Sequence, residues 1–309
     1  MKVAVTGSSG YIGSVLCRTL REQGLYVLAC DTAERKTHHY TDMFINESFD
    51  KDVFVDAIIN HGVECIFHLA ASSLLGPSAT DPLLYYHNNT ARLITFLSKL
   101  RNRGWKGHII FSSTAAVYGD RGEPVKETSI KIPCNNYGRS KLMCENVLEI
   151  ASLYGINVTM FRYFNVAGGY GDVGQDFNEP HIITRICNAA DGRSPLVVYG
   201  DAYPTPDGTC IRDYIHVRDV CAAQIHAMNN KLYDTYNLGT LNGTSVLEII
   251  EAFEQENAVK VPYSFGDIRE GDPAYLVANP QKFVDTGFEY KYSDINQIVK
   301  SAWEHYNGV

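Results

Sequence analysis

A regular alternation of strand-like and helix-like segments constrains the fold of this chain more than any other feature of its sequence. Apolar residues form a strand pattern from Lys2 to Thr6, and a glycine-rich turn then leads into apolar residues at helical spacing up to Gln23. The same order recurs, with strand patterns at 25–31, 63–70, 107–114 and 157–165 and helical patterns near 51–60, 84–102 and from 137. Because successive parallel strands need helical crossovers, the pattern predicts an α/β fold whose parallel sheet carries helices on both faces.

The sequence changes in character after Asn165. Glycines cluster between residues 168 and 174, and residues 199–209 are rich in proline, glycine, aspartate and tyrosine, which indicates long ordered loops. Later helical patterns near 217–229, 245–256 and 294–306 support a second, smaller unit. We expect a Rossmann-like, doubly wound parallel sheet over residues 1–166 and a smaller carboxyl-terminal α/β substrate-binding domain over residues 167–309. Some segments of the second domain are expected to return to the first sheet.

Charge and hydropathy narrow the classes of partner. The 309 residues carry 27 Lys and Arg against 35 Asp and Glu, so the net charge of -8 repels nucleic acid and anionic membranes, and phosphate must be bound locally. No segment reaches the roughly 18 uninterrupted apolar residues of a membrane span, and the amino terminus begins a strand without an apolar signal core. We expect a cytoplasmic protein with eight reduced cysteines. No metal site is expected, because the cysteines lack metal-ligand spacing. His216 has no second ligand at such spacing and is expected to be a buried structural histidine, and His38 and His39 are expected to be solvent-exposed in a polar loop.

The segment TGSSGYIGS places Gly7, Gly10 and Gly13 directly after the first strand and at the start of the first helix. Glycines there permit a tight turn and let backbone N–H groups approach a pyrophosphate at the positive end of the helix. Asp31 closes the second strand, where a carboxylate accepts hydrogen bonds from ribose hydroxyls and repels a 2′-phosphate. The pattern therefore predicts NAD as the cofactor.

Two alternatives stay open at this end of the chain. Asp31 could be an ordinary helix-capping or loop residue. The nearby cations Arg35 and Lys36 could accommodate a 2′-phosphate and weaken the preference for NAD over NADP.

A tyrosine and a lysine in the string NNYGRSK form the candidate catalytic pair. Tyr137 and Lys141 are four residues apart at the start of a helix, so both side chains emerge on one face. A phenol with a reference pKa of ~10 is a weak base at neutral pH, and a neighbouring ammonium favours its phenolate form. The hydroxyls of residues 112–114 end a strand, at the edge of a parallel sheet that faces the ligand crevice. Alone this spacing is common on exposed helices, but after a dinucleotide fingerprint it indicates catalysis.

The motifs TGSSGYIG, FSSTAAVYG and YGRSK resemble those of the extended short-chain dehydrogenase/reductase family, and YGDAYPTPDGTCIRDYIHVRD is similar to the signature of its UDP-glucose 4-epimerases. The resemblance runs from the first strand to REGDPAYLVANP near the carboxyl terminus. It implies an NAD-dependent epimerase of a UDP-hexose, commonly a homodimer through the helices around Tyr137 and Lys141. Tyr137 would remove the 4-hydroxyl proton, Lys141 would hold the nicotinamide ribose and depress the pKa of Tyr137, and Thr114 would hydrogen-bond the reacting oxygen. Hydride would pass to NAD and return to the opposite face of a rotated 4-keto sugar.

The same resemblance implies the remaining ligand contacts. On the substrate side, Arg212 and Arg269 would grip the UDP diphosphate with planar forks, and Asn165 would contact phosphate or sugar. Without the resemblance, a surface ion pair or a capping role would explain each of these three side chains equally well. Tyr203 would shape the uridine pocket, and Asp272 and Leu276 belong to the same substrate set. The cofactor set, beyond the three glycines and Asp31, is Tyr11, Ile12, Leu69, Ala70, Ala71, Asn89, Ser112, Ser113, Tyr137, Lys141 and Tyr163.

The chain departs from the family pattern at several positions. Ser73 stands where a lysine usually touches the cofactor, so one cation is missing, and FINESFDKD replaces the usual adenine-contacting segment. FNVAG stands where FNPVG is common, and EPHII replaces an asparagine-rich stretch. Leu276 aligns with the residue that gates the 2-position of the sugar. A residue smaller than tyrosine there suggests that N-acetylated substrates, UDP-GlcNAc and UDP-GalNAc, are also turned over.

Four other functions compete with a UDP-hexose epimerase. A UDP-pentose epimerase would share every motif. A nucleotide-sugar 4,6-dehydratase needs an acid/base pair directly after the active-site threonine, where this chain has Ala115 and Ala116. A noncatalytic sensor of NAD or nucleotide sugar would not need an activated phenol. A simple reductase would exchange its NADH, whereas an epimerase should hold NAD through turnover.

Overall fold

The computed structural model describes residues 1–33, 39–178, 180–268 and 272–309, and these form two compact units. The first unit comprises Met1–Val117, Ile130–Arg162 and Cys221–Tyr236, and the second comprises Tyr118–Ser129, Tyr163–Val220 and Asn237–Val309. The chain therefore enters the second unit at Tyr118, leaves it after Ser129 and enters it again at Tyr163, whereas a single boundary at residue 166 stays a prediction. No helix in these described ranges is long and apolar enough to cross a membrane.

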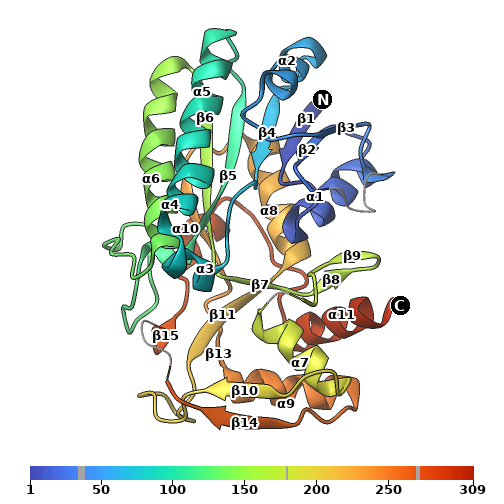
Figure 1. The fold of residues 1–309 in the computed structure, drawn as a ribbon, viewed down its shortest axis with the longest axis vertical. Coiled ribbons are helices and arrows are strands. Elements are labelled where there is room, and N and C mark those ends of the chain that lie inside the picture. The colour runs from blue at the N-terminus through green and yellow to red at the C-terminus, as the bar shows by residue number, and fades with distance from the viewer. Residues whose placement is uncertain (34–38, 179, 269–271) are drawn as a thin grey trace. The chain divides into compact units, whose positions relative to one another are not determined.

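A seven-stranded sheet forms the centre of the first unit (Figure 1). Its order is β12-β6-β5-β4-β1-β2-β3. The bounds are β1 Lys2–Thr6, β2 Tyr26–Asp31, β3 Met43–Asn46, β4 Cys65–His68, β5 His108–Thr114, β6 Asn157–Tyr163 and β12 Thr235–Leu238. The pairs β1 with β2, β1 with β4, β2 with β3 and β4 with β5 are all parallel. The predicted Rossmann-like fold class is confirmed, and β12, a late segment of the chain, forms one edge of this sheet.

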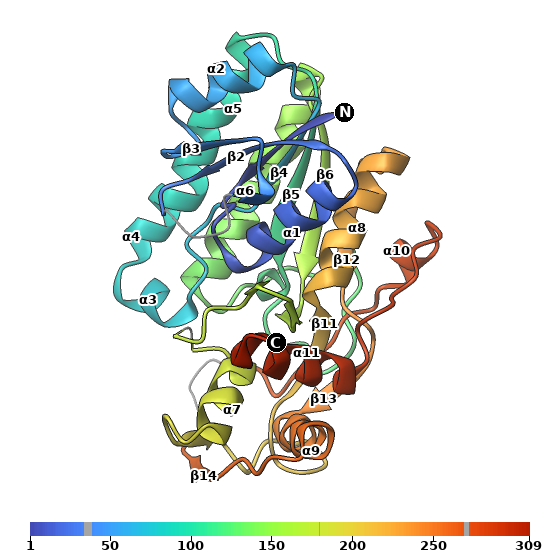
Figure 2. The ribbon, with the colours of Figure 1, turned by 90° about the vertical axis from the view of Figure 1, so that its right-hand side faces the viewer.

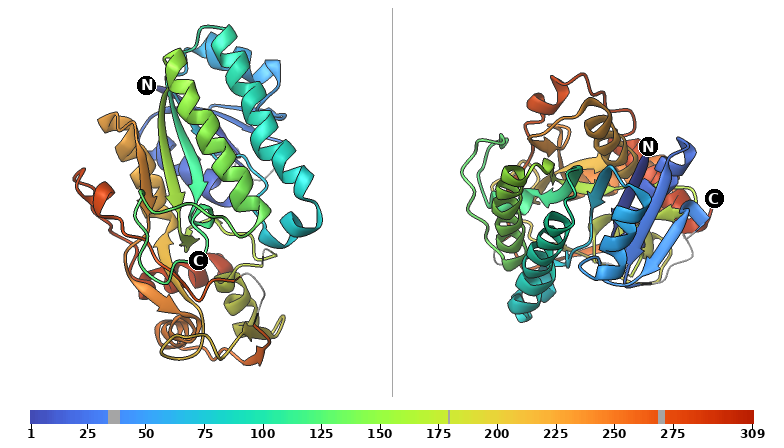
Figure 3. Two further views of the ribbon diagram at one scale, coloured as in Figure 1. Left: turned by 90° about the vertical axis from the view of Figure 1, so that its left-hand side faces the viewer. Right: turned by 90° about the horizontal axis from the view of Figure 1, so that it is seen from above.

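Helices cover both faces of this sheet, as the two views of Figure 3 show. Residues of α2, α5 and α6 form one core with inward-facing residues of the strands, among them Phe54, Phe96, Leu148, Ile66 and Phe111. On the other side α1 and α8 meet, where the Cys221 thiol lies 3.9 Å from the Ile12 carbonyl oxygen. The bounds are α1 Tyr11–Glu22, α2 Asp52–His61, α5 Arg92–Asn102, α6 Asn136–Ala151 and α8 Val217–Asn230.

The helix expected over residues 84–102 is not a single α-helix. It consists of α4 (Pro82–Tyr85), a π-helical segment (Tyr86–Ala91) and α5, after the short α3 (Leu75–Thr80). The π-helical segment carries Asn89, whose side chain is drawn into hydrogen bonds with Ser72 and Ser140. Such π-helical turns are rare overall, and those that occur are frequently found at functional sites. Hydrophobic periodicity alone does not reveal them.

The second unit is built around β11 (Ile211–His216). β11 pairs in parallel with β7 (Asn165–Ala167) and β15 (Tyr275–Leu276), and antiparallel with β13 (Gly243–Ser245). A separate parallel pair joins β10 (Leu196–Tyr199) to β14 (Tyr263–Gly266), and a short hairpin joins β8 (Gly169–Tyr170) to β9 (Val173–Gly174). The helices of this unit are α7 (Ile182–Ala190), α9 (Val246–Asn257), α10 (Gln281–Val284) and α11 (Ile295–Asn307), and Figure 2 shows α9 and α11 close together.

His216 joins α11 to β11 inside the second unit. The ring Nε2 lies 2.8 Å from the Ser301 hydroxyl, and Nδ1 accepts a hydrogen bond from the Arg218 backbone N–H at 3.0 Å. Burial, followed by the charge of Arg218, lowers the pKa of His216 to about 3, so the ring is neutral. Both nitrogens have protein partners, which agrees with a structural role. His39 is exposed as expected, whereas His38 lies outside the described residues.

Candidate active site

The glycine turn after β1 brings backbone segments closer together than any side chain allows. Gly7 has a positive φ of 71°, and its N–H donates to the Cys30 carbonyl at 2.9 Å. A Cβ atom on Gly7 would lie 2.7 Å from the Ala70 backbone nitrogen, and a Cβ on Gly13 would lie 2.1 Å from the Gly7 carbonyl oxygen. Glycine is therefore required at both positions by the packing of the turn against the start of α1 and the end of β4.

Two serine hydroxyls in the same turn are buried without a partner among the described residues. Ser8 is 5% exposed and Ser9 is 2% exposed, and neither Oγ atom makes a hydrogen bond. Buried hydroxyls are rarely left unpaired, so these two atoms point to a polar ligand that supplies the missing bonds. α1 begins directly after Gly10, which has no side chain to cap the helix, so the helix start also suits a phosphate group. The turn thus fits the pyrophosphate of a dinucleotide.

Asp31 supports this turn through its carboxylate. One carboxylate oxygen accepts from the Ser9 N–H at 2.9 Å and the other accepts from the Ala33 N–H at 3.0 Å. Each oxygen has a second lone pair, so the carboxylate can still accept from ligand hydroxyls. Arg35 and Lys36, which could shift the preference toward NADP, lie outside the described residues.

The segment after β4, which contains the half-buried Leu69, Ala70 and Ala71, is held by side chains on both sides. The Thr6 hydroxyl lies 2.8 Å from His68 Nδ1 and accepts from the Ala70 N–H at 3.3 Å. Asn89 accepts from the Ser72 N–H at 2.8 Å and donates to the Ser72 carbonyl at 3.0 Å. The predicted contact residue Asn89 therefore holds the backbone of the loop. Ser73, which replaces the family's lysine, is exposed in that loop.

Tyr137, Lys141 and Thr114 come together where β5 ends and α6 begins. The Asn135 side chain caps α6 by accepting from the Gly138 N–H at 2.8 Å, and a Cβ on Gly138 would lie 2.5 Å from the Ala116 carbonyl oxygen. The helix start therefore lies directly against the segment that follows Thr114. Thr114 Oγ1 accepts from the Ala116 N–H at 3.1 Å and is a hydrogen-bond partner of Tyr137, to which its proton can be directed.

Lys141 is 3% exposed and its ammonium has two neighbours on β5. Nζ donates to the Ser112 carbonyl at 2.7 Å and lies 4.7 Å from the centre of the Phe111 ring. Burial lowers the pKa of Lys141 to about 8, against the opposing effects of Cys144 and Glu145. The lysine is thus a buried cation close to its point of deprotonation.

The pKa of Tyr137 moves in the opposite direction from the sequence expectation. Burial raises it to about 12, and the hydrogen bond with Thr114 offsets only part of that rise. The ring also meets Tyr85 edge-on, with centroids 6.5 Å apart. In the protein by itself the phenol is therefore protonated at neutral pH.

Apart from Thr114, the predicted substrate residues that the structure describes lie in the second unit. Arg212 is on β11, with its backbone opposite Leu276 of β15, and its guanidinium donates to the Ile211 carbonyl at 2.9 Å. Within the described ranges no carboxylate pairs with Arg212, so an ion pair, the alternative role, is not seen there. Asn165 lies on β7 beside Tyr214 and hydrogen-bonds its hydroxyl.

For the other predicted residues of this unit, the structure shows mainly how far each side chain is buried. Tyr203 is 9% exposed, with its ring against Gly200, and Tyr163 is 7% exposed. Asp272 is half-buried, and Arg269 lies outside the described residues.

Two acidic residues that sequence reasoning missed are deeply buried beside predicted ones. Asp213, next to Arg212, accepts from Thr240 N–H, Thr240 Oγ1, Leu241 N–H and Ala278 N–H at 2.8–3.1 Å. It thereby holds the turn at residue 240 and the end of β15 against β11. Glu145 lies one helical turn after Lys141, which was the available sequence signal for it.

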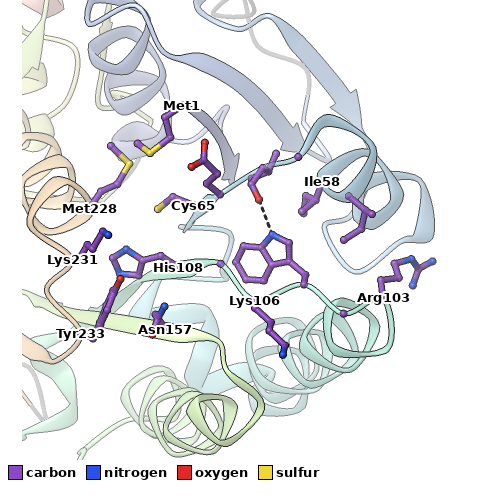
Figure 4. A pocket seen from close by; sticks show the side chains of 17 residues that line it. Met1, Ile58, Cys65, Arg103, Lys106, His108, Asn157, Met228, Lys231 and Tyr233 are labelled. Atoms are coloured by element: carbon purple, nitrogen blue, oxygen red, sulfur yellow. Dashed lines mark hydrogen bonds between the residues drawn. The ribbon is translucent and has the colours of Figure 1, made fainter.

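A cavity of about 560 Å³ in the first unit lies away from all these groups (Figure 4). Its lining includes the first residues of three strands, Cys65 of β4, His108 of β5 and Asn157 of β6. Trp105, also in the lining, donates from Nε1 to the Val63 carbonyl at 2.8 Å. Ligand sites of parallel sheets lie beyond the carboxyl ends of the strands, and none of the predicted site residues lines this cavity.

Comparisons with known proteins agree with this geometry. The model of the NAD dependent epimerase/dehydratase family matches residues 3–239. The chain is 39% identical to a UDP-glucose 4-epimerase of Lacticaseibacillus casei, over 98% of this chain and 96% of that protein. A crystal structure of UDP-glucose-4-epimerase from Stenotrophomonas maltophila with bound NAD and formylated UDP-arabinopyranose superposes with a TM-score of 0.93 and 31% identity, covering 99% of this chain and 98% of the other. The UDP-Glc/GlcNAc 4-epimerase of Campylobacter jejuni has a TM-score of 0.85 and 32% identity, covering 100% and 99%.

Gly13→Ala is expected to abolish retention of NAD, because its Cβ would lie 2.1 Å from the Gly7 carbonyl oxygen and open the turn. Gly76→Ala is the matched control, since nothing lies within 4 Å of a Cβ there. NAD released from each purified, denatured protein would be quantified against protein concentration, with circular dichroism as the test of folding. Retention of NAD by a folded Gly13→Ala protein at the level of the control would contradict a pyrophosphate site in this turn.

Proposed function

The chain belongs to the NAD dependent epimerase/dehydratase family, and from that premise we propose that it interconverts UDP-glucose and UDP-galactose by NAD-dependent epimerisation at C4 of the hexose. The observation that carries this proposal is the cluster of Tyr137, Thr114 and Lys141 at the carboxyl end of β5, in the same unit as the glycine turn. The near full-length similarity to the Lacticaseibacillus casei UDP-glucose 4-epimerase supports the assignment.

Three side chains have separate tasks in this reaction. Tyr137 takes the proton of the sugar 4-hydroxyl and later returns it. The Thr114 hydroxyl, which is held by the Ala116 N–H, hydrogen-bonds the Tyr137 oxygen and would also hydrogen-bond the reacting oxygen of the sugar. Lys141 holds a buried positive charge beside them through its bond to the Ser112 carbonyl. NAD, when bound, supplies a hydride acceptor and a positive charge, and Ser8, Ser9, Asp31 and the three glycines of the turn would hold it. Because burial alone raises the pKa of Tyr137, base catalysis requires cationic neighbours, which favour the phenolate.

The second unit would bind the nucleotide part of the substrate. The Arg212 guanidinium is only partly exposed and, in the described part of the chain, has no carboxylate partner, so it is available to a diphosphate. Asn165, Tyr203 and Asp272 would add contacts to the phosphate, uridine or sugar, and Arg269 would add a second cation. Tight binding of the nucleotide with loose binding of the hexose would allow the 4-keto sugar to rotate in the site between the two hydride transfers.

The site does not match two of the rival functions, a 4,6-dehydratase and a sensor. Thr114 is followed by Ala115, which is 4% exposed, and Ala116, so the acid/base pair that a 4,6-dehydratase needs at these positions is missing. A sensor would have no use for a phenol that is hydrogen-bonded to a directed hydroxyl. We therefore rank the epimerase first.

Broader sugar specificity is a second proposal. Solved relatives include a UDP-Glc/GlcNAc 4-epimerase and an enzyme crystallised with a formylated UDP-arabinopyranose. Leu276 was predicted to gate the 2-position of the sugar. Because side chains alternate along a strand, the neighbouring Tyr275 projects from the opposite face of β15. The proposal is that Leu276, and not Tyr275, faces the sugar and leaves space for an N-acetyl group.

A homodimer in the cytoplasm completes the proposal. α5 and α6 lie side by side (Figure 3) and expose large apolar side chains, Ile94 at 47%, Met143 at 49% and Ile150 at 53%. Exposed apolar groups on adjacent helices favour association with a second copy through these helices. All eight cysteines are free thiols, which supports a reducing compartment.

Purified protein without added cofactor is expected to convert UDP-galactose to UDP-glucose, because bound NAD is regenerated in each cycle. The sugar would be followed by NMR. Tyr137→Phe is expected to lower turnover about a hundredfold or more while leaving UDP-sugar affinity unchanged, since it removes the proton acceptor only. Undiminished turnover by Tyr137→Phe would remove Tyr137 from the mechanism. No conversion of UDP-galactose, even with NAD added, would transfer the proposal to an N-acetylhexosamine or pentose substrate.

Leu276→Tyr is expected to reduce kcat/KM for UDP-GalNAc at least tenfold and to leave UDP-galactose nearly unaffected, because the larger side chain fills the space for the N-acetyl group. Tyr275→Phe is the control on the opposite face of the strand. Equal loss for both substrates, or no detectable N-acetyl activity in the unmodified protein, would end the proposal that Leu276 gates this position.

Met143→Glu combined with Ile150→Glu is expected to produce a monomer in sedimentation velocity, because two buried charges in an interface are costly. Val53→Glu on α2 introduces a charge at an equally exposed apolar site, 55%, and should leave the mass unchanged. An unmodified protein that sediments as a monomer would disprove the dimer.

A further inference from the structure

Three consecutive residues of β5 each take their partner from α6. The Ser112 carbonyl accepts from Lys141 at 2.7 Å, and the Thr114 hydroxyl is hydrogen-bonded to Tyr137. Between them, the Ser113 hydroxyl donates to a Glu145 carboxylate oxygen at 2.6 Å. Ser113 was predicted to contact the cofactor, yet its side chain is 2% exposed and bonded to the helix that carries the catalytic pair.

Glu145 is fully buried and its two carboxylate oxygens are used in several bonds. Arg162 on β6 donates from Nε to one oxygen at 2.9 Å and from Nη2 to the other at 2.8 Å. The Lys131 ammonium lies 3.7 Å from the second oxygen. Since Arg162 is itself only 3% exposed, Glu145 and Arg162 form a two-pronged ion pair away from water.

This ion pair sets the charge around Lys141. The titratable and charged groups that interact with Lys141 are Cys144 and Glu145 on its own helix and His68 on β4. His68 is buried and has a pKa lowered to about 3, chiefly by burial, so it is neutral. The buried charges near Lys141 are therefore one carboxylate and one guanidinium, with the Lys131 ammonium, 29% exposed, at the edge.

We propose that Glu145 is a positioning residue of the active site, which with Arg162 locks Ser113 against α6 and keeps the Lys141 ammonium charged. The proposal rests on the function proposed above. Glu145 touches neither Tyr137 nor Thr114 in any hydrogen bond, and it acts through Ser113, which lies between the partners of the catalytic pair. It also supplies the negative charge that counteracts the effect of burial on the pKa of Lys141.

Loss of Glu145 and loss of the whole pair have different electrostatic consequences. Glu145→Gln keeps an oxygen that accepts from Ser113 but removes the Glu145 counter-charge of the buried Arg162 guanidinium. The excess positive charge disfavours a protonated Lys141. Removing both charges with Glu145→Gln and Arg162→Met restores the original balance, and replacement of a buried ion pair by uncharged groups is often tolerated. A purely structural role predicts the reverse, because the double variant loses more hydrogen bonds.

The deciding measurement is the pKa of Lys141, obtained by NMR titration of lysine side chains in protein saturated with NAD. Lys141→Met identifies the resonance. Glu145→Gln is expected to lower this pKa by on the order of one pH unit, Arg162→Met to raise it, and the double variant to return it to the original value. Glu149→Gln, an exposed carboxylate one turn further along α6, is the control and should change nothing. This readout needs no turnover, so it separates the proposal from the assignment of an epimerase.

The activity readout follows the same directions. The decline of kcat at high pH is expected to move to lower pH in Glu145→Gln and to recover in the double variant, with KM for UDP-galactose unchanged. If Glu145→Gln fails to fold, the comparison of Arg162→Met with the double variant tests the proposal instead. The Lys141 pKa must then be higher in Arg162→Met than in the double variant. An unchanged Lys141 pKa in all folded variants, or the same shift in the single and double variants, would overturn the proposal.

Discussion

The hydrogen bond from the Lys141 ammonium to the Ser112 carbonyl is the interaction on which the arrangement of the active site depends. A buried cation is stable only with a partner, and here the partner is the backbone of the strand that ends in Thr114. The bond fixes the register between α6 and β5, and with it the distance between Tyr137 and Thr114. Glu145 and Arg162 extend the same contact by one helical turn, so the catalytic helix is held to two strands by buried polar groups rather than by apolar packing alone.

These contacts explain how an ordinary phenol is placed for proton transfer without being ionised in advance. Burial raises the pKa of Tyr137 and lowers that of Lys141, so the two groups are brought toward neutrality by the same loss of water. Charge that arrives with ligands can then change the ionisation of both. A site of this kind is sensitive to small changes in nearby charge, which is the basis of the proposal made for Glu145.

Much of this arrangement could be predicted from the sequence because it rests on local patterns. Gly7 and Gly13 follow a strand at a spacing that is typical of a dinucleotide turn, and Tyr137 and Lys141 share a helix face by their spacing of four. The π-helical turn at residues 86–91 could not be predicted, because its apolar periodicity matches an ordinary helix and the bonds of Asn89 to Ser72 and Ser140 are tertiary. The upward shift of the Tyr137 pKa was equally hidden, since the shift depends chiefly on burial.

By itself, the sequence determined the parallel α/β fold, and it predicted the dinucleotide turn and the candidate catalytic pair, because each depends on residues that are neighbours along the chain. The tertiary structure alone decided the contacts among Ser113, Glu145 and Arg162, which are brought together from β5, α6 and β6. It also decided that Asp213 binds the turn at residue 240 rather than a ligand. The physical reason is that hydrogen bonds and ion pairs between distant segments depend on packing and burial, and neither quantity is encoded in the spacing of residues.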